Sequence, residues 1–204
     1  MRRKEFQVEQ EEKLAGFLNG MSFGFLGTSD EMGLPRVTPL NFVYLEGNFY
    51  FHGSHAGGKM KSIRHNQRVC FTVADEYAII PSYFSDPELA CPATAYFKSV
   101  TAYGQAELVE DLAEKAAVLA LFMQKLQPEG GYAPIDAEDP RYRSALKGVA
   151  VVRIVPEEVT AKFKFGQNLK EDARNAVTQG LQDRNGARDA ETIAMMEKYC
   201  PYHS

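Results

Sequence analysis

The chain has 204 residues and a formal net charge of −4, with 45% hydrophobic and 25% charged residues. Such values are typical of a globular protein with one domain or two small ones. The negative charge argues against binding of nucleic acid over the whole surface, and no apolar run approaches the ~20 residues of a membrane-spanning helix. Because no apolar core follows the charged first residues, we also expect no secretory signal.

The three cysteines, Cys70, Cys91 and Cys200, are widely spaced and odd in number. This pattern is typical of free thiols in a reducing compartment, so we expect a cytoplasmic protein without a disulfide framework. No grouping of His, Cys, Asp and Glu has the spacing of a zinc site, and we therefore expect no bound metal.

The first third of the chain predicts one helix and then a β-rich block. Apolar residues at helical spacing predict a helix over Glu9–Asn19, which ends at an Asn-Gly pair. The turn at residues 46–48 predicts a hairpin in which Phe49–His52 pairs with Val37–Tyr44. The predicted strands are Met21–Thr28, Pro35–Tyr44, Asn48–His52 and Arg68–Ala74, with a short helix over Lys59–Asn66.

The rest of the chain predicts more strands and several helices. Prolines at 81, 87 and 92 predict a long loop over Glu76–Ala95, and Gly104 inside the next strand indicates a bulge or a close backbone approach. Asp111 is the expected N-cap of a helix. The predicted elements are strands Tyr96–Glu110, Gly148–Val155 and Val159–Phe165, helices Leu112–Leu126 and Arg141–Leu146, and two helices within Lys170–Tyr199 broken at Asn185-Gly186.

Six or seven strands joined mostly by short turns indicate a closed or nearly closed antiparallel barrel with helices around it. A doubly wound parallel sheet would need a helix after nearly every strand, which the pattern does not provide. The fold class expected from the sequence is therefore α+β, mainly β with peripheral and C-terminal helices.

The segment from Phe49 to Asn66 has the composition of an anion site. A short aromatic strand leads into a turn rich in glycine, Gly53 to Gly58, and then into a basic helix that begins at Lys59. Glycines let backbone N–H groups approach a phosphate, and the helix N-terminus and the lysine add positive charge. The segment predicts a phosphorylated cofactor. Lys61, about 200° further around the helix, is expected to contribute less.

A nucleotide P-loop is the obvious alternative, since Gly53 to Lys59 fits G-x-x-x-x-G-K. Met60 follows, however, where a P-loop has a Ser or Thr that binds magnesium. The preceding strand also belongs to a hairpin instead of a parallel βαβ unit. These two features argue against ATP or GTP hydrolysis.

Three stretches of the chain form a recognisable combination. They are Pro35-Arg-Val-Thr-Pro-Leu-Asn41, then Phe49-Tyr-Phe-His-Gly-Ser54 with Lys59-Met-Lys-Ser-Ile-Arg-His-Asn-Gln-Arg-Val69, and Ser99-Val-Thr-Ala-Tyr-Gly-Gln-Ala106. Together they resemble the pyridoxamine 5′-phosphate oxidase-like flavoproteins, and among them most closely the nitroimidazole-reductase (Nim-type) branch. The similarity covers residues 10–165 in the order of elements.

The resemblance implies an FMN-binding split β-barrel over residues 1–165, with a helical extension over 166–204 packed on it, and a homodimer that holds two FMN molecules at its interface. By position, Lys59 would hold the phosphate with Gly58 beside it, and Ser99 would lie on a neighbouring strand. The wall along the flavin would comprise Arg36, Val37, Thr38, Pro39, His52, Gly53 and Ser54.

The chain also departs from the oxidases of this family. It has no tryptophan, and its C-terminus lacks the Trp and Arg motif that closes the vitamin-phosphate site, so oxidation of pyridoxamine phosphate is not expected. The added C-terminal helices are closer to the Nim-like and regulator-like relatives.

The leading functional expectation is an FMN-dependent oxidoreductase that reduces a small electron-poor compound such as a nitroaromatic or a quinone. A flavin-binding sensor or regulator without turnover is the main alternative. Haem binding, for which His203 is the only hint, and deazaflavin binding also stay open on this barrel. No helix-turn-helix with a basic recognition face is apparent, which argues against direct DNA binding.

Overall fold

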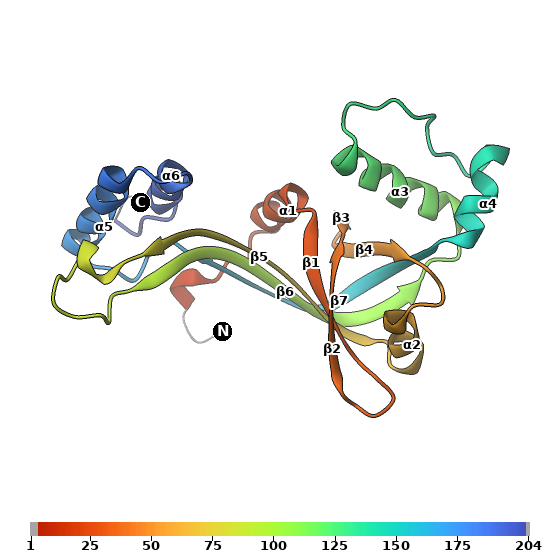
Figure 1. Cartoon of the computed structure of the whole chain (residues 1–204), viewed down its shortest axis with the longest axis horizontal. Coiled ribbons are helices and arrows are strands. Elements are labelled where there is room, and N and C mark those ends of the chain that lie inside the picture. Colours follow the sequence, from red (N-terminus) through yellow and green to blue (C-terminus); the bar gives the residue numbers. More distant parts are fainter. Residues whose placement is uncertain (1–3, 203–204) are drawn as a thin grey trace. The chain divides into compact units, whose positions relative to one another are not determined.

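The computed structural model describes residues 4–202, which form one seven-stranded sheet and its helices (Figure 1). The strands are β1 (Phe23–Ser29), β2 (Pro35–Asn41), β3 (Val43–Leu45), β4 (Asn48–Gly53), β5 (Arg68–Ile80), β6 (Thr94–Leu108) and β7 (Ala150–Lys164). The helices are α1 (Glu11–Gly20), α2 (Gly58–His65), α3 (Leu112–Leu126), α4 (Pro140–Gly148), α5 (Glu171–Arg184) and α6 (Asp189–Lys198), with 3₁₀ turns at Lys4–Phe6 (η1) and Ser82–Phe84 (η2).

The strand order in the sheet is β2-β1-β5-β6-β7-β4-β3. The pairs β1–β2, β1–β5, β3–β4 and β4–β7 are all antiparallel. The predicted α+β class with a mostly antiparallel sheet is therefore confirmed. None of the helices between residues 4 and 202 combines the length and the apolar character that a bilayer crossing requires.

The chain divides into two compact units. The central unit comprises Gln10–Val73 and Thr101–Val159. The terminal unit comprises the described residues up to Glu9, the segment Ala74–Val100 and the described residues from Thr160 on. The strands β5, β6 and β7 contribute residues to both units.

The core of the central unit is built on β4, β7 and α3. Val43, Tyr50, Val118, Phe122 and Val151 are buried and pack together. The helix α3 begins where the sequence predicts, because the Asp111 carboxylate accepts a hydrogen bond of 2.7 Å from the backbone N–H of Glu114. Packing of this apolar helix face against the sheet fixes the position of β4, which leads into the candidate site.

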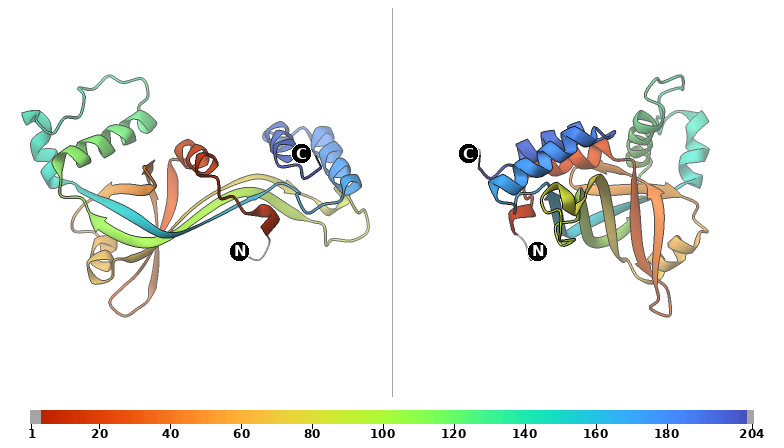
Figure 2. Two further views of the ribbon diagram at one scale, coloured as in Figure 1. Left: turned by 180° about the vertical axis from the view of Figure 1, so that it is seen from behind. Right: turned by 60° about the vertical axis from the view of Figure 1, so that its left-hand side comes forward.

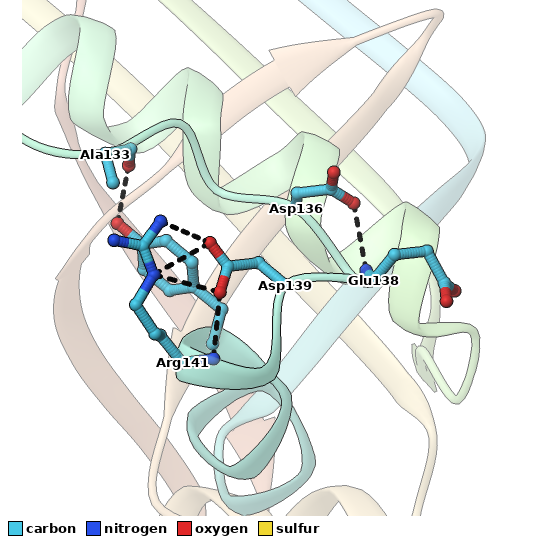
Figure 3. A network of polar contacts seen from close by, with 6 residues as sticks. Ala133, Asp136, Glu138, Asp139 and Arg141 are labelled. Carbon is cyan, nitrogen blue, oxygen red and sulfur yellow. Dashed lines mark hydrogen bonds and ion pairs between the residues drawn. The ribbon is translucent and has the colours of Figure 1, made fainter.

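The connection between α3 and α4 is held by side chains that bond to the nearby backbone (Figure 3). Asp139 caps α4 by accepting the N–H of Arg141 at 2.9 Å, and it also pairs with the Arg141 guanidinium. Asp136 accepts the N–H of Glu138 at 2.9 Å. These local contacts, together with the packing of Ala137 against Ala116 and Leu146, order a segment rich in Pro, Gly and Asp.

In the terminal unit, α5 and α6 lie side by side (Figures 1 and 2). Asn185 separates them in a left-handed conformation with φ 48°, which confirms the predicted break. Arg188 forms hydrogen bonds of 2.7 and 2.9 Å with both carboxylate oxygens of Asp75. The Arg184–Asp189 pair, at 2.6 Å, ties the end of α5 to the start of α6.

The predicted second strand is interrupted. It divides at Phe42, which is 1% exposed and whose N–H donates to the Ser22 carbonyl at 3.1 Å. As a result β2 pairs with β1, and only β3 forms the hairpin with β4. The predicted pairing of Phe49–His52 with the whole of Val37–Tyr44 is wrong for this reason.

Two further strands are longer than the sequence predicts. The expected loop from Glu76 is strand as far as Ile80, because Tyr77 and Ile80 are buried and Tyr77 stacks edge-on against Phe165 at 5.0 Å. The two predicted strands around Pro156 form one continuous strand, β7. Burial at spaced positions thus outweighs the local signals for loop structure.

Gly104 occupies a position without room for a side chain. A Cβ added there would lie 2.0 Å from the carbonyl oxygen of Val155 and 2.8 Å from the Cα of Pro156. The predicted close backbone approach is confirmed, and both neighbouring atoms belong to the backbone of β7, which cannot move without loss of pairing.

We expect Gly104→Ala to lower the free energy of unfolding by about 1–3 kcal/mol or more, since the added methyl group forces strands apart. Gly16→Ala is the matched control, because nothing lies within 4 Å of a Cβ added at this exposed helix position. The control should stabilise the protein by about 0.5–1 kcal/mol. Urea denaturation of both variants measures the difference, and equal effects would contradict the close approach.

Candidate functional site

A cavity of about 620 Å³ lies in the central unit, where the β1–β2 hairpin faces the first turn of α2. Such a volume falls in the range of small-molecule sites, roughly 300–1,000 Å³. Its lining residues are Thr28, Asp30, Glu31, Met32, Arg36, Val37, Thr38, Gly58, Lys59, Lys61 and Ser62.

The register of the hairpin sets which face of the sheet each of its residues occupies. Thr28 opposes Arg36, and Leu26 opposes Thr38. Directly opposed residues of an antiparallel pair share one face of the sheet, so Thr28, Arg36 and Thr38 lie on the same side. Gly33, with φ 77°, allows the tight turn that joins the two strands.

Asp30 organises this turn and the base of the cavity. One carboxylate oxygen accepts the N–H groups of Met32 and Leu34, each at 3.0 Å, and the other accepts two hydrogen bonds from Arg36 at 2.9 and 3.1 Å. The hydrogen bond from Arg36, and then those from the backbone, lower the pKa of Asp30. Arg36 therefore enters the cavity with its charge largely compensated.

The start of α2 supplies backbone donors. Its N-cap is Gly57, which has no side chain to accept a hydrogen bond from the helix N-terminus. The N–H groups of Met60 and Lys61 bond to the Gly57 carbonyl at 3.0 and 3.2 Å. The N–H groups of Gly58 and Lys59 precede them in the first turn, where the helix offers no intrahelical acceptor. This end of α2 is suited to an anion.

Lys59 and Lys61 both line the cavity, and neither pairs with a carboxylate in the described part of the chain. The Lys59 ammonium lies 5.7 Å from the centre of the Phe51 ring. The smaller contribution expected of Lys61 stays a prediction, although Lys61 also lines the cavity. The residues of α2 that line the cavity are Gly58, Lys59, Lys61 and Ser62. At 100° per residue they span about 160° around the helix axis, with Lys59 and Lys61 at the two ends of this arc.

Thr28 provides the most specific feature of the site. It is only 6% exposed, and its hydroxyl group has no hydrogen-bond partner among residues 4–202. A buried hydroxyl without a partner is costly, which indicates that a bound group supplies the partner. A phosphate beside Lys59 and the start of α2 has the right chemistry, so these residues fit a phosphorylated cofactor.

The loop before α2 is fixed by its own contacts. The hydroxyl of Ser54 accepts the N–H of Ala56 at 3.2 Å, and Arg64 reaches back to the carbonyl of His55 at 3.0 Å. A Cβ at Gly53 would lie only 3.1 Å from the Lys59 Nζ. Gly53 thus leaves room for the lysine, while Ser54 holds the turn and is not among the lining residues.

His52 lies at the end of β4, exposed on one side and edge-on to Phe122 with 4.7 Å between ring centres. Loss of solvent around the ring, and then the charge of Lys59, lower the pKa of His52. His52 does not line the cavity. Its pKa is nevertheless lowered in part by the charge of Lys59, which does line it.

Of the site residues predicted from the sequence, five line this cavity and four others of the central unit lie outside its lining. Ser99 lies on β6 in the terminal unit, and its predicted role stays a prediction. The residues inside are Arg36, Val37, Thr38, Gly58 and Lys59, and those outside are Pro39, His52, Gly53 and Ser54.

Sequence reasoning missed Thr28, Asp30 and Ser62, which line the cavity. A threonine that ends an alternating strand carries no signal of its own. The Asp30–Gly33 turn could have been recognised, since an aspartate two residues before a backbone N–H is a common turn signal.

Comparison with known proteins places this geometry in context. Residues 10–163 match the family model described as pyridoxamine 5′-phosphate oxidase. The chain is 27% identical over 202 residues to the protease synthase and sporulation protein PAI 2 of Bacillus subtilis (strain 168), with 95% of each chain covered.

Similar solved structures include the flavocytochrome Anf3 from Azotobacter vinelandii, with 26% identity, a TM-score of 0.65 and coverage of 84% of this chain and 75% of that one. A protein named for 5-nitroimidazole antibiotic resistance from Bacteroides thetaiotaomicron has 24% identity, a TM-score of 0.60 and coverage of 76% and 85%. An FAD and haem binding protein from Mycobacterium smegmatis shares the fold at 16% identity, with a TM-score of 0.62 and coverage of 83% and 78%.

We expect Lys59→Ala to raise the pKa of His52 part of the way toward its ordinary value of about 6.5, because burial remains after the charge is removed. Lys147→Ala, at an exposed position of α4, should leave this pKa unchanged. NMR titration of the His52 ring, assigned with a His52→Gln variant, measures it. An identical His52 pKa in the protein and in Lys59→Ala would contradict the coupling.

The same pKa has a consequence for stability. The folded ring takes up its proton at lower pH than the unfolded ring, so the unfolded state binds more protons as the pH falls. The contribution of His52 to stability is therefore present above about pH 6.5 and is lost on acidification below it. His52→Gln should flatten this part of the stability profile.

Proposed function

Because the chain belongs to the pyridoxamine 5′-phosphate oxidase family, we propose that it is a flavoprotein that holds FMN in the cavity between the β1–β2 hairpin and α2. One observation carries the proposal. The buried hydroxyl of Thr28, which has no partner among the described residues, lines the same cavity as Lys59 and Lys61.

The phosphate of the cofactor would be held by Lys59, Lys61, the first N–H groups of α2 and the hydroxyl of Thr28. The charge balance supports this assignment, since Arg36 and Asp30 compensate each other and leave two lysines against Glu31. Among the described residues that line the cavity, one helix start and one hydroxyl without a partner, that of Thr28, suit one terminal phosphate. The proposed cofactor is therefore FMN, in preference to FAD.

When bound, the flavin supplies the electron-transfer chemistry, and the chain's residues position it and set its electrostatic surroundings. We propose an oxidoreductase of the Nim-type branch whose substrate is a small electron-poor compound, such as a nitroaromatic or a quinone. The nitroimidazole resistance protein of the same fold supports this substrate class. The free state of Cys70, Cys91 and Cys200 supports a cytoplasmic location.

A homodimer is part of the proposal. The face of the hairpin opposite Thr28 exposes large apolar side chains, with Phe23 46%, Phe25 44% and Val37 68% exposed. These residues lie on β1 and on the edge strand β2, directly beside the cavity. Exposed aromatic residues next to a cofactor cavity are typical of an interface, and a second copy would cover the open side of the flavin.

A regulator that binds flavin without turnover is the second candidate. The similarity to the protease synthase and sporulation protein PAI 2 supports it, because that match covers 95% of this chain. Steady-state reduction of a nitroaromatic by the flavin-loaded protein separates the two candidates. Turnover favours the oxidoreductase, and its absence with flavin bound favours the regulator.

Lys59→Ala should weaken FMN binding by roughly ten- to hundred-fold, the effect of a charge-assisted contact worth about 1.5–3 kcal/mol. Lys61→Ala should also weaken binding, since both side chains line the cavity. Thr28→Val should weaken it without loss of apo stability, because it removes a hydroxyl that has no partner among the described residues. Lys147→Ala is the control, and quenching of flavin fluorescence measures affinity.

The identity of the cofactor is checked by releasing it with heat and separating it by chromatography. Recovery of FAD, of haem or of no flavin after reconstitution would contradict the proposal. An unchanged affinity in Lys59→Ala would place the phosphate elsewhere.

Phe25→Glu should convert the dimer to a monomer, since it puts a charge into the apolar surface of the hairpin. Leu126→Glu, at a residue that is 56% exposed on α3, should leave the dimer intact. Sedimentation velocity of both variants measures the assembly. An unmodified chain that sediments as a monomer and still binds FMN tightly would refute the shared site.

A further inference from the structure

We infer a buried anion site in the terminal unit, formed by the guanidinium of Arg174 on α5 and the hydroxyl of Tyr96 on β6, and suited to chloride. Both residues, and the turn at residues 165–169 that lies against them, belong to this unit. None of the residues that line the proposed flavin cavity takes part in the site.

Arg174 is a buried cation without a counter-charge in the described chain. It is only 6% exposed and forms no ion pair with a carboxylate between residues 4 and 202. Its Nη1 donates to the carbonyls of Phe165 and Gly166 at 3.2 and 3.3 Å, whereas its buried Nη2 has no hydrogen-bond partner among the same residues. A guanidinium keeps its charge when buried. Because carbonyl groups accept hydrogen bonds but carry no net charge, the cation stays uncompensated, which is costly.

Tyr96 brings a second unsatisfied donor to the same turn. The side chain is 1% exposed, and its hydroxyl has no hydrogen-bond partner within the part of the chain that the structure describes. A Cβ added at Gly166 would lie 2.5 Å from the hydroxyl oxygen, and the carbonyl of this glycine is bound by Arg174. Burial raises the pKa of Tyr96 to about 12, while the charge of Arg174 opposes the rise. The hydroxyl therefore stays protonated near the guanidinium, with a hydrogen to donate.

A bound anion would satisfy both groups at once. It would accept hydrogen bonds from the Arg174 Nη2 and from the Tyr96 hydroxyl, and it would supply the negative charge that the guanidinium lacks. A buried water molecule would fill the same hydrogen-bonding positions but would leave the charge uncompensated.

The surroundings limit the anion to a small one. Tyr96 also borders a cavity of about 340 Å³, but Arg174 and Gly166 do not line it. The ring of Phe165, which is fully buried, lies 6.1 Å from that of Tyr96 and occupies space beside it. Side chains so enclosed leave no room for an organic acid or a phosphate, and one guanidinium matches a single negative charge. Chloride meets both conditions.

The test follows thermal unfolding of the full-length protein in sodium chloride and in sodium gluconate of equal ionic strength. Chloride should raise the Tm by at least about 3 °C at ten times its dissociation constant. Tyr96→Phe should reduce this rise without lowering the Tm in gluconate, because the hydroxyl has no partner among the described residues. Tyr83→Phe, at a tyrosine of the same unit that is 66% exposed, is the matched control and should keep the full rise. General salt effects cancel in the difference between these variants.

Two further variants assign the charge. Arg174→Met replaces the cation by an apolar side chain of similar length and should abolish the rise in Tm. Lys59→Ala should keep it, which separates this site from the proposed phosphate site.

Crystals of the unmodified protein grown in sodium bromide locate the anion directly. Anomalous scattering should show one bromide in contact with the Arg174 Nη2 and the Tyr96 hydroxyl. No bromide there, an equal chloride response in Tyr96→Phe, or loss of the response in Lys59→Ala would each overturn the proposal. Bromide at the site without a chloride-dependent Tm would indicate an adventitious ion only and would overturn it as well.

Discussion

The antiparallel register between β1 and β2 decides which side chains meet the start of α2. Thr28 opposes Arg36 on the cavity side, and Phe25 opposes Pro39 on the outer side. A shift by one residue would exchange the two faces, carrying the threonine hydroxyl to solvent and the phenyl ring to the core. Asp30 secures the turn through two backbone N–H groups and the Arg36 guanidinium, so the same carboxylate that fixes the register also compensates the nearest positive charge.

The arginines that pair with carboxylates and the lysines that line the proposed flavin cavity have different tasks in this protein. Arg36, Arg153 and Arg188 each pair with carboxylates at 2.7 to 3.0 Å, where the planar guanidinium holds a turn or joins two elements. Lys59 and Lys61 line the cavity without such a partner among the described residues. An ammonium group on a flexible stem is well hydrated until an anion displaces its water, so unpaired lysines mark where a ligand's charge would be balanced.

The type and order of the elements could be predicted from the sequence, but several of their ends could not. Hydrophobic periodicity and caps such as Asp111 are local signals, and the structure confirms them. The ends of β5 and β7 depend on distant packing instead. Tyr77 continues β5 because it packs on Phe165, and β7 passes Pro156 without a break. No window of a few residues contains that information.

The candidate site shows the same division between local and distant information. Lys59 and Gly58 could be identified because the anion-binding properties of a helix start are local to the chain. Thr28 could not, since its importance arises only when β1 and α2 come together and leave its hydroxyl buried, with no partner in the part of the chain that the structure describes. Lys61 lies about 200° further around the helix than Lys59, yet both line the cavity, because the cavity spans a wide arc around the first turn. A binding site at a helix end is therefore less selective for one helix face than a binding site along its side.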